Sequence, residues 1–326
     1  MNYNKKKQLF KCLLLLLFAM NKNVLITGVA GFIGSNLADM LLRNDFNVIG
    51  IDNLSYGVLE QVPKGVEFYK EDIRNNNIHK LFTNIDCVFH LAAKNSLIDC
   101  EKNPFETEDI NVNGTKNIFE AAVRQNIRKI IYAESSAVYE GAQKFPSSES
   151  DVAPQSVYAK SKMATNFIAR DFLKSHGLIS TGLRYFNVYG PKQDYRRTIP
   201  PVFSAFIIKL LQKKSPTIYG DGSKKRDFVY VDDVNNFHLM CINNDKTNNK
   251  VFNIGSGKNY SIKDVYEEIS LILGSDISPL FEANFDFEAQ ENLANINEAR
   301  KIGWNPTTNL SEGLKKSIDY IKENVI

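Results

Sequence analysis

The chain has 326 residues, of which 43% are hydrophobic and 24% charged, and its formal net charge is +3. This composition excludes a collagen, a low-complexity chain and a polytopic membrane protein, and the length fits about two domains. Because the charge is nearly balanced, we predict no nucleic-acid partner. The four cysteines have neither disulfide-framework nor metal-ligand spacing, which predicts no metal site and a reducing, cytoplasmic location.

The first twenty residues form a separate segment. Lysines at positions 5–7 precede a run of nine apolar residues at 12–20, a pattern that resembles a signal peptide or a weak membrane anchor. A bilayer span takes roughly 20 apolar residues, and no small-residue cleavage site follows the run. Met20 stands shortly before a strand pattern that begins at Val24. We therefore expect residues 1–20 to be an extension or a misassigned start, and we expect no membrane association.

From Val24 onward, short apolar runs alternate with helical patterns. The predicted strands cover residues 24–27, 46–52, 66–71, 87–91, 129–133 and 179–185, and the predicted helices cover 32–43, 75–82, 104–125 and 156–175. Strands that alternate with helices in this way predict an α/β fold, with a parallel sheet covered on both faces.

After Tyr185 the alternation breaks into segments marked by proline and glycine, which predicts a smaller second domain interleaved with the first. Strand patterns return at residues 228–231 and 251–254. The predicted cofactor-binding domain therefore comprises residues 21–184 and 228–256. The predicted substrate domain comprises residues 185–227 and 257–326.

Three glycines, Gly28, Gly31 and Gly34, follow the first strand and open the first helix. Glycines at such a turn let the backbone approach a pyrophosphate, which then binds at the helix N-terminus. Asp52 ends the second strand, where a carboxylate can accept hydrogen bonds from an adenosine ribose and repel a 2′-phosphate. This pattern predicts binding of NAD rather than NADP.

Further strand ends fall in register with this turn. Asp72 and Ile73 end the third strand, where they could contact the adenine. Leu91, Ala92 and Ala93 follow the fourth strand at the same edge of the sheet. Together with the glycines and Asp52, these residues predict a dinucleotide site.

A second signal is the pair Tyr158 and Lys162, which share one face of a predicted helix. A phenol is a weak base at its usual pKa of about 10. A lysine ammonium and a positively charged nicotinamide nearby would lower that pKa. Ser135 ends the fifth strand and offers a hydroxyl to the same substrate oxygen. The three residues predict proton removal from a hydroxyl group as a hydride leaves the same carbon.

These motifs resemble the extended short-chain dehydrogenase/reductases that act on nucleotide sugars. The resemblance covers about residues 21–306 and rests on motifs in the family's order, at residues 27–34, 52–55, 90–93, 111–115, 135–139, 158–162, 184–191, 226–233 and 253–256. It implies a doubly wound parallel Rossmann sheet with NAD as the cofactor. It also implies a nucleotide-sugar substrate and a homodimer formed through the helices predicted at 104–125 and 156–175.

By this resemblance the site residues fall into three groups. The catalytic residues would be Ser135, Tyr158 and Lys162. Asn187 and Arg226 would contact the nucleotide diphosphate, although Asn187 could instead cap the chain after a strand and Arg226 could pair with Asp227. The cofactor residues would be Gly28, Gly31, Phe32, Ile33, Gly34, Asp52, Asn53, Asp72, Ile73, Leu91, Ala92 and Ala93, together with Tyr158 and Lys162.

The reaction that follows oxidation at sugar carbon 4 is left open between two alternatives. A standard 4,6-dehydratase commonly has Asp and Glu after the catalytic hydroxyl residue, whereas here Ser136 and Ala137 follow it. Glu134 and Glu140, however, stand where epimerases commonly have Ser and Gly. A carboxylate near an enclosed site invites an acid or base role, but both could also be exposed loop charges.

The nucleotide and the sugar are open as well. Residues 285–288 lack the arginine that epimerases use to clamp a UDP-sugar, which leaves room for GDP. As a whole, the sequence is similar to the nucleotide-activated N-acetylglucosamine 4,6-dehydratases of legionaminic acid synthesis. The favoured interpretation is a 4,6-dehydratase of GDP- or UDP-linked N-acetylglucosamine, and the alternative is a 4-epimerase of the UDP-N-acetylglucosamine or UDP-glucose type.

Overall fold

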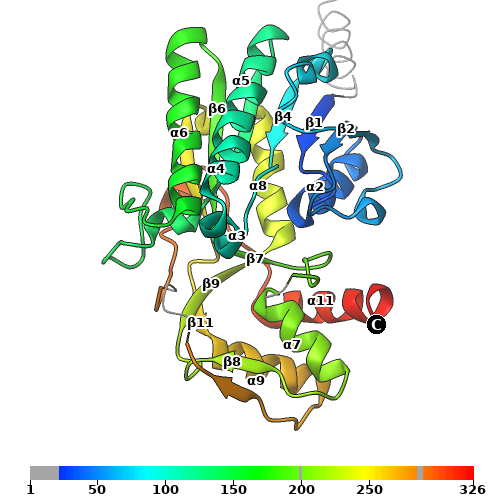
Figure 1. Cartoon of the computed structure of the whole chain (residues 1–326), viewed down its shortest axis with the longest axis vertical. Coiled ribbons are helices and arrows are strands. Elements are labelled where there is room, and N and C mark those ends of the chain that lie inside the picture. The colour runs from blue at the N-terminus through cyan, green and yellow to red at the C-terminus, as the bar shows by residue number, and fades with distance from the viewer. Residues whose placement is uncertain (1–21, 198–199, 285–288) are drawn as a thin grey trace, which may run out of the picture.

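A seven-stranded sheet forms the larger part of the computed structural model, which describes residues 22–197, 200–284 and 289–326 (Figure 1). The predicted extension at residues 1–20 lies outside the described residues. Every strand pair in this sheet is parallel, which confirms the predicted doubly wound α/β fold. In spatial order the strands are β10 (Lys250–Ile254), β6 (Ile179–Tyr185), β5 (Lys129–Ser135), β4 (Cys87–His90), β1 (Asn23–Thr27), β2 (Asn47–Asp52) and β3 (Glu67–Lys70).

Helices cover both faces of this sheet because apolar residues alternate between its two sides along the central strands. On one face Val24 and Ile26 pack in a core with α2 (Phe32–Arg43), α8 (Val231–Asn243) and α10 (Asn297–Lys301). On the other face Leu25 packs in a core with α5 (Thr115–Arg124) and α6 (Val157–His176). Burial on both faces explains why these strands are continuous apolar runs in the sequence.

Two of the predicted helices differ from the observed elements. The helix predicted at 104–125 is divided into α4 (Pro104–Glu108), a π-helical segment (Asp109–Gly114) and α5. The helix predicted at 75–82 is only a 3₁₀ segment, Ile78–Phe82, because the side chain of Asn75 accepts a hydrogen bond from the N–H of Asn77 (2.9 Å) and favours a turn. The short helix α3 (Leu97–Lys102) was not predicted.

A second, smaller body lies at the other end of the molecule and has its own apolar core (Figure 1). It contains a three-stranded sheet in the order β11 (Asn259–Ser261), β9 (Lys225–Tyr230) and β7 (Asn187–Tyr189). A two-stranded sheet pairs β12 (Leu280–Glu282) with β8 (Thr217–Tyr219). The accompanying helices are α7 (Val202–Leu211), α9 (Ile262–Leu273) and α11 (Leu310–Asn324).

One predicted strand belongs to a different sheet from the one we expected. The strand pattern at residues 228–231 was assigned to the cofactor-binding domain, but β9 pairs with β7 and β11 in the smaller body. The chain returns to the main sheet only with α8 and β10. A buried strand has the same apolar sequence pattern in either sheet. The pattern indicates that the strand is buried, but it does not identify the neighbouring strand.

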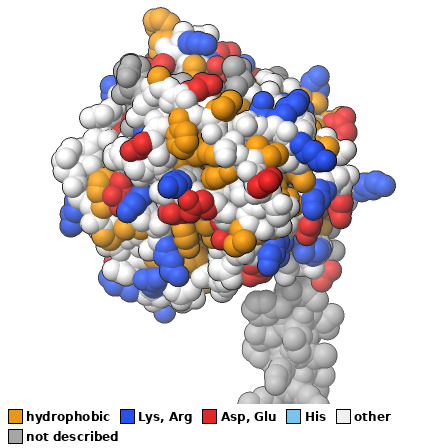
Figure 2. Space-filling view, turned by 90° about the horizontal axis from the view of Figure 1, so that it is seen from below, with side chains coloured by type: hydrophobic (Ala, Val, Ile, Leu, Met, Phe, Trp, Pro, Cys, Tyr) orange, Lys and Arg blue, Asp and Glu red, His pale blue; other side chains and the backbone are white. Residues whose placement is uncertain are grey.

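The surface shows no field of one charge on the face seen in Figure 2, where acidic, basic and apolar side chains are interspersed. This distribution agrees with the nearly balanced net charge of +3.

Candidate active site

One cavity of about 630 Å³ at the carboxyl ends of the main-sheet strands gathers the predicted site residues. Elements of the second body, including Phe203 of α7 and Phe228 of β9, line its other side. The predicted residues that line it are Gly28, Gly31, Phe32, Ile33, Gly34, Asp52, Asn53, Asp72, Ile73, Leu91, Ala92, Ala93, Glu134, Ser135, Glu140, Tyr158, Lys162, Asn187 and Arg226. The fold therefore brings every one of them to a single place, while their individual roles stay predictions.

The glycine turn between β1 and α2 contributes to this cavity. Gly28 has a φ of +77°, and a Cβ there would lie 2.8 Å from the backbone nitrogen of Ala92. Gly34 packs against the turn so closely that a Cβ would lie 2.1 Å from the carbonyl oxygen of Gly28. The N-cap residue of α2, Gly31, offers no side-chain cap, so side chains leave the first N–H groups of the helix to a ligand. This cradle fits the pyrophosphate of a dinucleotide.

Asp52 lies at the end of β2, and its carboxylate contacts the backbone of the glycine turn and of the residues that follow β2. It accepts hydrogen bonds from the N–H groups of Ala30 (3.0 Å) and Leu54 (2.8 Å). Burial raises the pKa of this carboxyl, and the two backbone hydrogen bonds oppose that rise. The position fits the predicted contact with an adenosine ribose.

Asp72 belongs to a charged cluster at the end of β3. Arg74 contacts its carboxylate at 2.8 Å, and the side-chain amide of Asn53 donates a hydrogen bond to it at 3.0 Å. The hydrogen bond from Arg74 holds the pKa of Asp72 well below its usual range. The cluster keeps an anionic, hydrogen-bonded edge where an adenine or ribose would bind.

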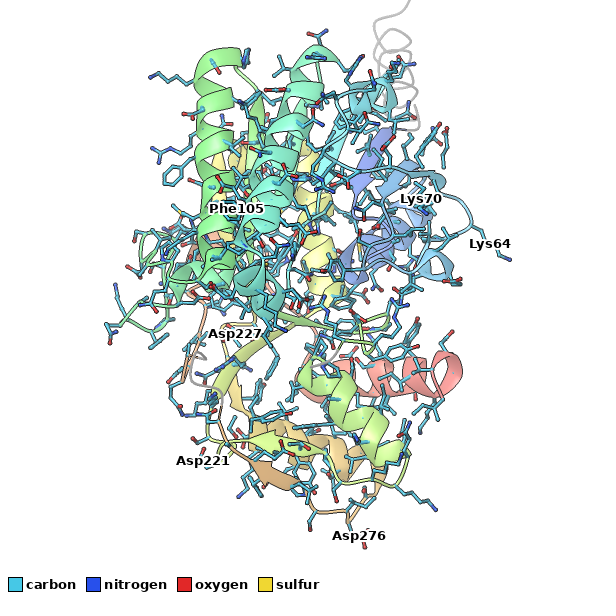
Figure 3. All side chains as sticks on the ribbon, viewed as in Figure 1. Lys64, Lys70, Phe105, Asp221, Asp227 and Asp276 are labelled. Carbon is cyan, nitrogen blue, oxygen red and sulfur yellow. The ribbon has the colours of Figure 1, made fainter. Side chains whose placement is uncertain are left out.

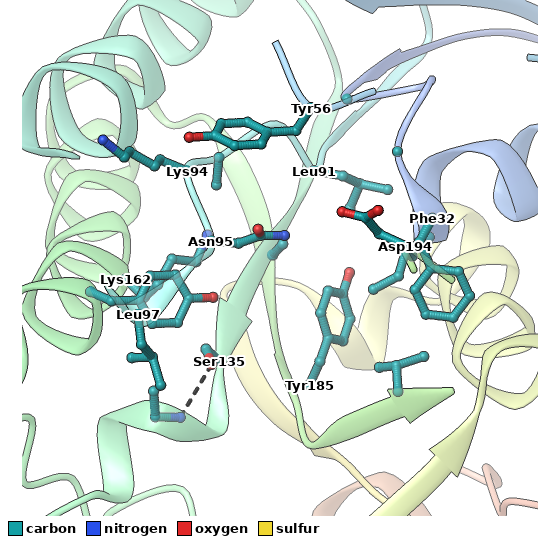
Figure 4. A pocket seen from close by; sticks show the side chains of 18 of the residues that line it. Phe32, Tyr56, Leu91, Lys94, Asn95, Leu97, Ser135, Lys162, Tyr185 and Asp194 are labelled. Carbon is teal, nitrogen blue, oxygen red and sulfur yellow. Dashed lines mark hydrogen bonds between the residues drawn. The ribbon is translucent and has the colours of Figure 1, made fainter. Parts of the chain in front are cut away.

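Tyr158 and Lys162 lie in the first turns of α6 and line the cavity together with Ser135 at the end of β5. Figure 4 shows Lys162 and Ser135 among the lining side chains. The helix begins at a capped residue, since the Ser156 hydroxyl accepts a hydrogen bond from the N–H of Ala159 (3.1 Å). The Ser135 hydroxyl interacts with the Tyr158 phenol and accepts a hydrogen bond from the N–H of Ala137 at 3.2 Å. The predicted trio of proton-handling residues is thus assembled in the cavity.

Burial shifts the pKa values of Tyr158 and Lys162 in opposite directions. Burial raises the pKa of Tyr158 to about 12, while the interaction with Ser135 and the charge of Arg197 lower it. The expectation that Lys162 and a positively charged nicotinamide together lower the pKa of Tyr158 stays a prediction, because it includes the charge of the cofactor. Burial lowers the pKa of Lys162 itself to about 8, and the negative charge of Glu134 opposes that effect. The Lys162 side chain is buried and lines the cavity, which suits its ammonium to a ligand hydroxyl.

Glu134, one of the two suggested acid or base residues, is closed off from the cavity. Its carboxylate contacts Nε of Arg184 at 2.7 Å, and the two side chains are only 0% and 3% exposed. It also accepts a hydrogen bond from the side-chain amide of Asn166 at 3.2 Å. Glu134 is among the residues that line the cavity, but its side chain has no exposed surface.

Glu140 is half-buried and binds the start of α6. Its two carboxylate oxygens accept hydrogen bonds from the N–H and the hydroxyl of Ser156, both at 2.9 Å. A negative charge at a helix N-terminus is favourable. The carboxylate is therefore occupied by the helix that carries Tyr158.

Asn187 and Arg226 come from the second body, on β7 and β9. The amide of Asn187 donates to the carbonyl oxygen of Asp227 (3.1 Å) and to the side chain of Asn292 (3.2 Å). The Asp227 carboxylate accepts hydrogen bonds from the backbone N–H groups of Ser256 (2.6 Å) and Ala294 (3.0 Å). Asp227 anchors these loops near the junction of the two bodies (Figure 3).

Two side chains outside the predicted site residues lie at the cavity wall or directly behind it. Asn111, in the π-helical segment, accepts a hydrogen bond from the N–H of Lys94 (2.8 Å) and donates one to the hydroxyl of Ser161 (3.0 Å). Lys94 lines the cavity, is only 4% exposed and forms an ion pair with Glu106. A π-helical segment often marks a functional site, but nothing in the spacing of residues 104–125 indicates one.

Comparison with known proteins gives the family. Residues 24–255 match the model of the NAD-dependent epimerase/dehydratase family. The chain belongs to this family. The resemblance to extended short-chain dehydrogenase/reductases is thereby confirmed, and the chain is an NAD-dependent enzyme of nucleotide-sugar epimerase or dehydratase type.

Individual family members are similar over nearly their whole length. A UDP-glucose 4-epimerase of Thermotoga maritima, solved with UDP-glucose, has a TM-score of 0.90 at 32% identity, covering 93% of this chain and 100% of that one. A UDP-N-acetylglucosamine 4-epimerase of Methanobrevibacter ruminantium M1, in complex with UDP-N-acetylmuramic acid, has a TM-score of 0.90 at 34% identity, covering 94% and 99%. A UDP-glucuronate 4-epimerase of Thermodesulfobacterium geofontis is 30% identical, over 92% of this chain and 96% of its own.

Among the described residues, no helix is long and apolar enough to cross a membrane. Among the same residues, no group of three or more His, Cys, Asp or Glu side chains could hold a metal ion. The cytoplasmic location stays a prediction.

Proposed function

We propose that the protein is a nucleotide-sugar 4-epimerase, which inverts the hydroxyl group at carbon 4 of a UDP-hexose. The observation that carries this proposal is the state of the carboxylates beside Ser135. Glu134 is paired with Arg184 and closed off from the cavity, and Glu140 is bound to the start of α6. Dehydration needs an acid and a base for carbons 5 and 6, whereas epimerisation needs proton transfer at carbon 4 alone.

The proton of the carbon-4 hydroxyl group passes to and from Tyr158. Its phenolate accepts the proton of the hydroxyl group, and the Ser135 hydroxyl donates a hydrogen bond to the same sugar oxygen. The glycine turn and Asp52 would hold NAD, which when bound would supply the acceptor and donor of the carbon-4 hydride and a positive charge close to the phenol. Tyr158 then gives the proton back to the oxygen. Lys162 supplies a donor for a cofactor hydroxyl beside the phenol.

The uridine part of the proposal is supported by the relatives, since the three described above are named for UDP-sugars. Their sugars differ, so likeness alone does not select among glucose, N-acetylglucosamine and glucuronate. The stretch at residues 285–288, where the arginine clamp is missing, lies outside the described residues. The GDP alternative therefore stays a prediction.

A direct test is incubation of the enzyme with UDP-glucose, UDP-N-acetylglucosamine, UDP-glucuronate and GDP-N-acetylglucosamine, with the products resolved by chromatography and mass spectrometry. A 4-epimerase yields an isomer of unchanged mass from at least one UDP-sugar. Loss of one water would instead support the 4,6-dehydratase that the sequence favoured and would overturn this proposal.

The predicted homodimer is part of the same proposal. Phe105 of α4 is 83% exposed (Figure 3). Phe167 of α6 is 53% exposed, and both residues lie on helices predicted to form the contact. Large exposed apolar side chains on neighbouring helices mark an interaction surface. Sedimentation equilibrium tests it, with a dimer expected for the wild type and a monomer for Phe105→Asp combined with Phe167→Asp.

A further inference from the structure

Two carboxylates beside Ser135 contact the same helix, α6, at two different places. Glu140 holds its start, through the N–H and hydroxyl groups of Ser156. Glu134 holds its third turn, through the side-chain amide of Asn166 (3.2 Å). Tyr158 and Lys162 lie between these two contacts.

Glu134 is itself fixed from the neighbouring strand β6. Arg184 contacts its carboxylate at 2.7 Å and donates further hydrogen bonds to the hydroxyl of Tyr139 (2.8 Å) and the carbonyl oxygen of Glu149 (2.6 Å). Every member of this network is paired, which is the condition under which a buried charged group adds rigidity. Position 134 is therefore a rigid anchor for α6, one residue before Ser135.

We propose that Glu134 and Glu140 are positioning residues, a two-point brace that fixes Tyr158 and Lys162 of α6 relative to Ser135 of β5. This inference rests on the proposed function, because it assigns the brace to the transfer at carbon 4. It replaces the acid or base role suggested by the sequence. An error of about 1 Å in the placement of catalytic groups costs on the order of a hundredfold in rate, so bracing both ends of the catalytic segment has a direct kinetic effect.

Glu134 also supplies a negative charge that favours the charged form of Lys162. The groups that act on the Lys162 ammonium are Glu134 of β5, His90 of β4 and Cys100 of α3. His90 is buried and neutral, and burial keeps Cys100 a thiol. Loss of the Glu134 charge would leave Arg184 unpaired nearby, and both changes disfavour the charged form of Lys162.

The test compares Glu134→Gln and Glu140→Gln with a control, Glu149→Gln. Glu149 is a partly buried carboxylate beside Arg184, and it accepts its hydrogen bond from the N–H of Asn253 (2.9 Å) and not from α6. Enzyme loaded with NAD is mixed with excess UDP-sugar in a stopped-flow instrument, and the appearance of NADH absorbance gives the rate of the first transfer. Both brace variants are expected to slow it by roughly ten- to a hundredfold, with unchanged product and a control like the wild type.

An acid or base role gives the opposite result. In that case Glu134→Gln or Glu140→Gln keeps the wild-type rate of NADH appearance and fails to release product. This result would overturn the proposal that the two residues brace α6. An epimerase and a dehydratase share the first hydride transfer. A wild-type product that has lost water therefore refutes the proposed function, whereas the rate of NADH appearance in the variants still tests the brace.

A second readout separates positioning from a general loss of structure. Competitive acylation of lysines, read by peptide mass spectrometry across a pH series, reports the protonation of Lys162. We expect its midpoint to fall by about one pH unit in Glu134→Gln and to stay unchanged in Glu140→Gln and Glu149→Gln. An unchanged midpoint in Glu134→Gln contradicts the charge role. If Glu134→Gln fails to fold, the half-buried Glu140→Gln decides the brace alone, and a wild-type rate in it overturns the proposal.

Discussion

Gly34 lies directly against the carbonyl oxygen of Gly28, so that a Cβ on Gly34 would stand 2.1 Å from that oxygen. No side chain of an L-amino acid fits this space without displacing the turn. We predict that Gly34→Ala destabilises the protein by about 3 kcal/mol and abolishes NAD binding, measured by thermal unfolding and calorimetric titration. Gly31→Ala, whose Cβ would lie 3.2 Å from the same oxygen, should destabilise it less. Equal effects would contradict the close approach of Gly34.

Tyr158→Phe removes one oxygen atom from the cavity and leaves the phenyl ring in place. Because the phenol is the only proton acceptor at carbon 4 in the proposed reaction, we predict a loss in kcat of about 10²- to 10⁴-fold. NAD affinity should remain within a few-fold of the wild type. A variant with near-normal kcat would remove Tyr158 from the reaction.

Arg226 reaches the cavity from the second body, where a guanidinium suits a diphosphate. We predict that Arg226→Met raises the KM for the UDP-sugar roughly tenfold and leaves NAD binding unchanged. The matched variant Arg226→Lys keeps the charge without the planar fork of donors and should give an intermediate KM. An unchanged KM in Arg226→Met would place the diphosphate elsewhere.

Two buried histidines, His90 and His238, make stability depend on acid pH. Burial lowers the pKa of each from 6.5 to about 3. Between these values the unfolded chain binds protons that the folded chain does not, so stability falls as pH drops through this window. Each histidine contributes a slope of about 1.4 kcal/mol per pH unit.

Glutamine at position 90 tests this linkage, since its amide can bond to the Thr27 and Thr115 hydroxyls that His90 contacts at 2.8 and 2.9 Å. Urea unfolding across the pH window should show that His90→Gln removes about half of the slope from these two residues. The surface variant His79→Gln is the control and should keep the full slope. An unchanged slope in His90→Gln would show that His90 titrates normally in the folded protein.

The parallel sheet and the gathering of the site residues were predictable from the sequence for a physical reason. Parallel strands end at one edge of the sheet, so residues that follow separate strands, such as Asp52 and Ser135, must meet there. The partner of a side chain is not encoded locally. Nothing near Glu134 in the sequence shows that Arg184, fifty residues further on, neutralises it. The sheet to which β9 belongs and the π-helical segment at Asn111 likewise depend on tertiary contacts.

The most direct test of the proposed reaction is the fate of deuterium placed on carbon 4 of the UDP-sugar. The proposed epimerase removes that deuterium as a hydride equivalent and returns it to the same carbon. We therefore predict, by mass spectrometry and NMR, an isomeric product that retains deuterium at carbon 4. A product that has lost water and carries deuterium at carbon 6 would contradict the proposal, as would replacement of the label by hydrogen from solvent.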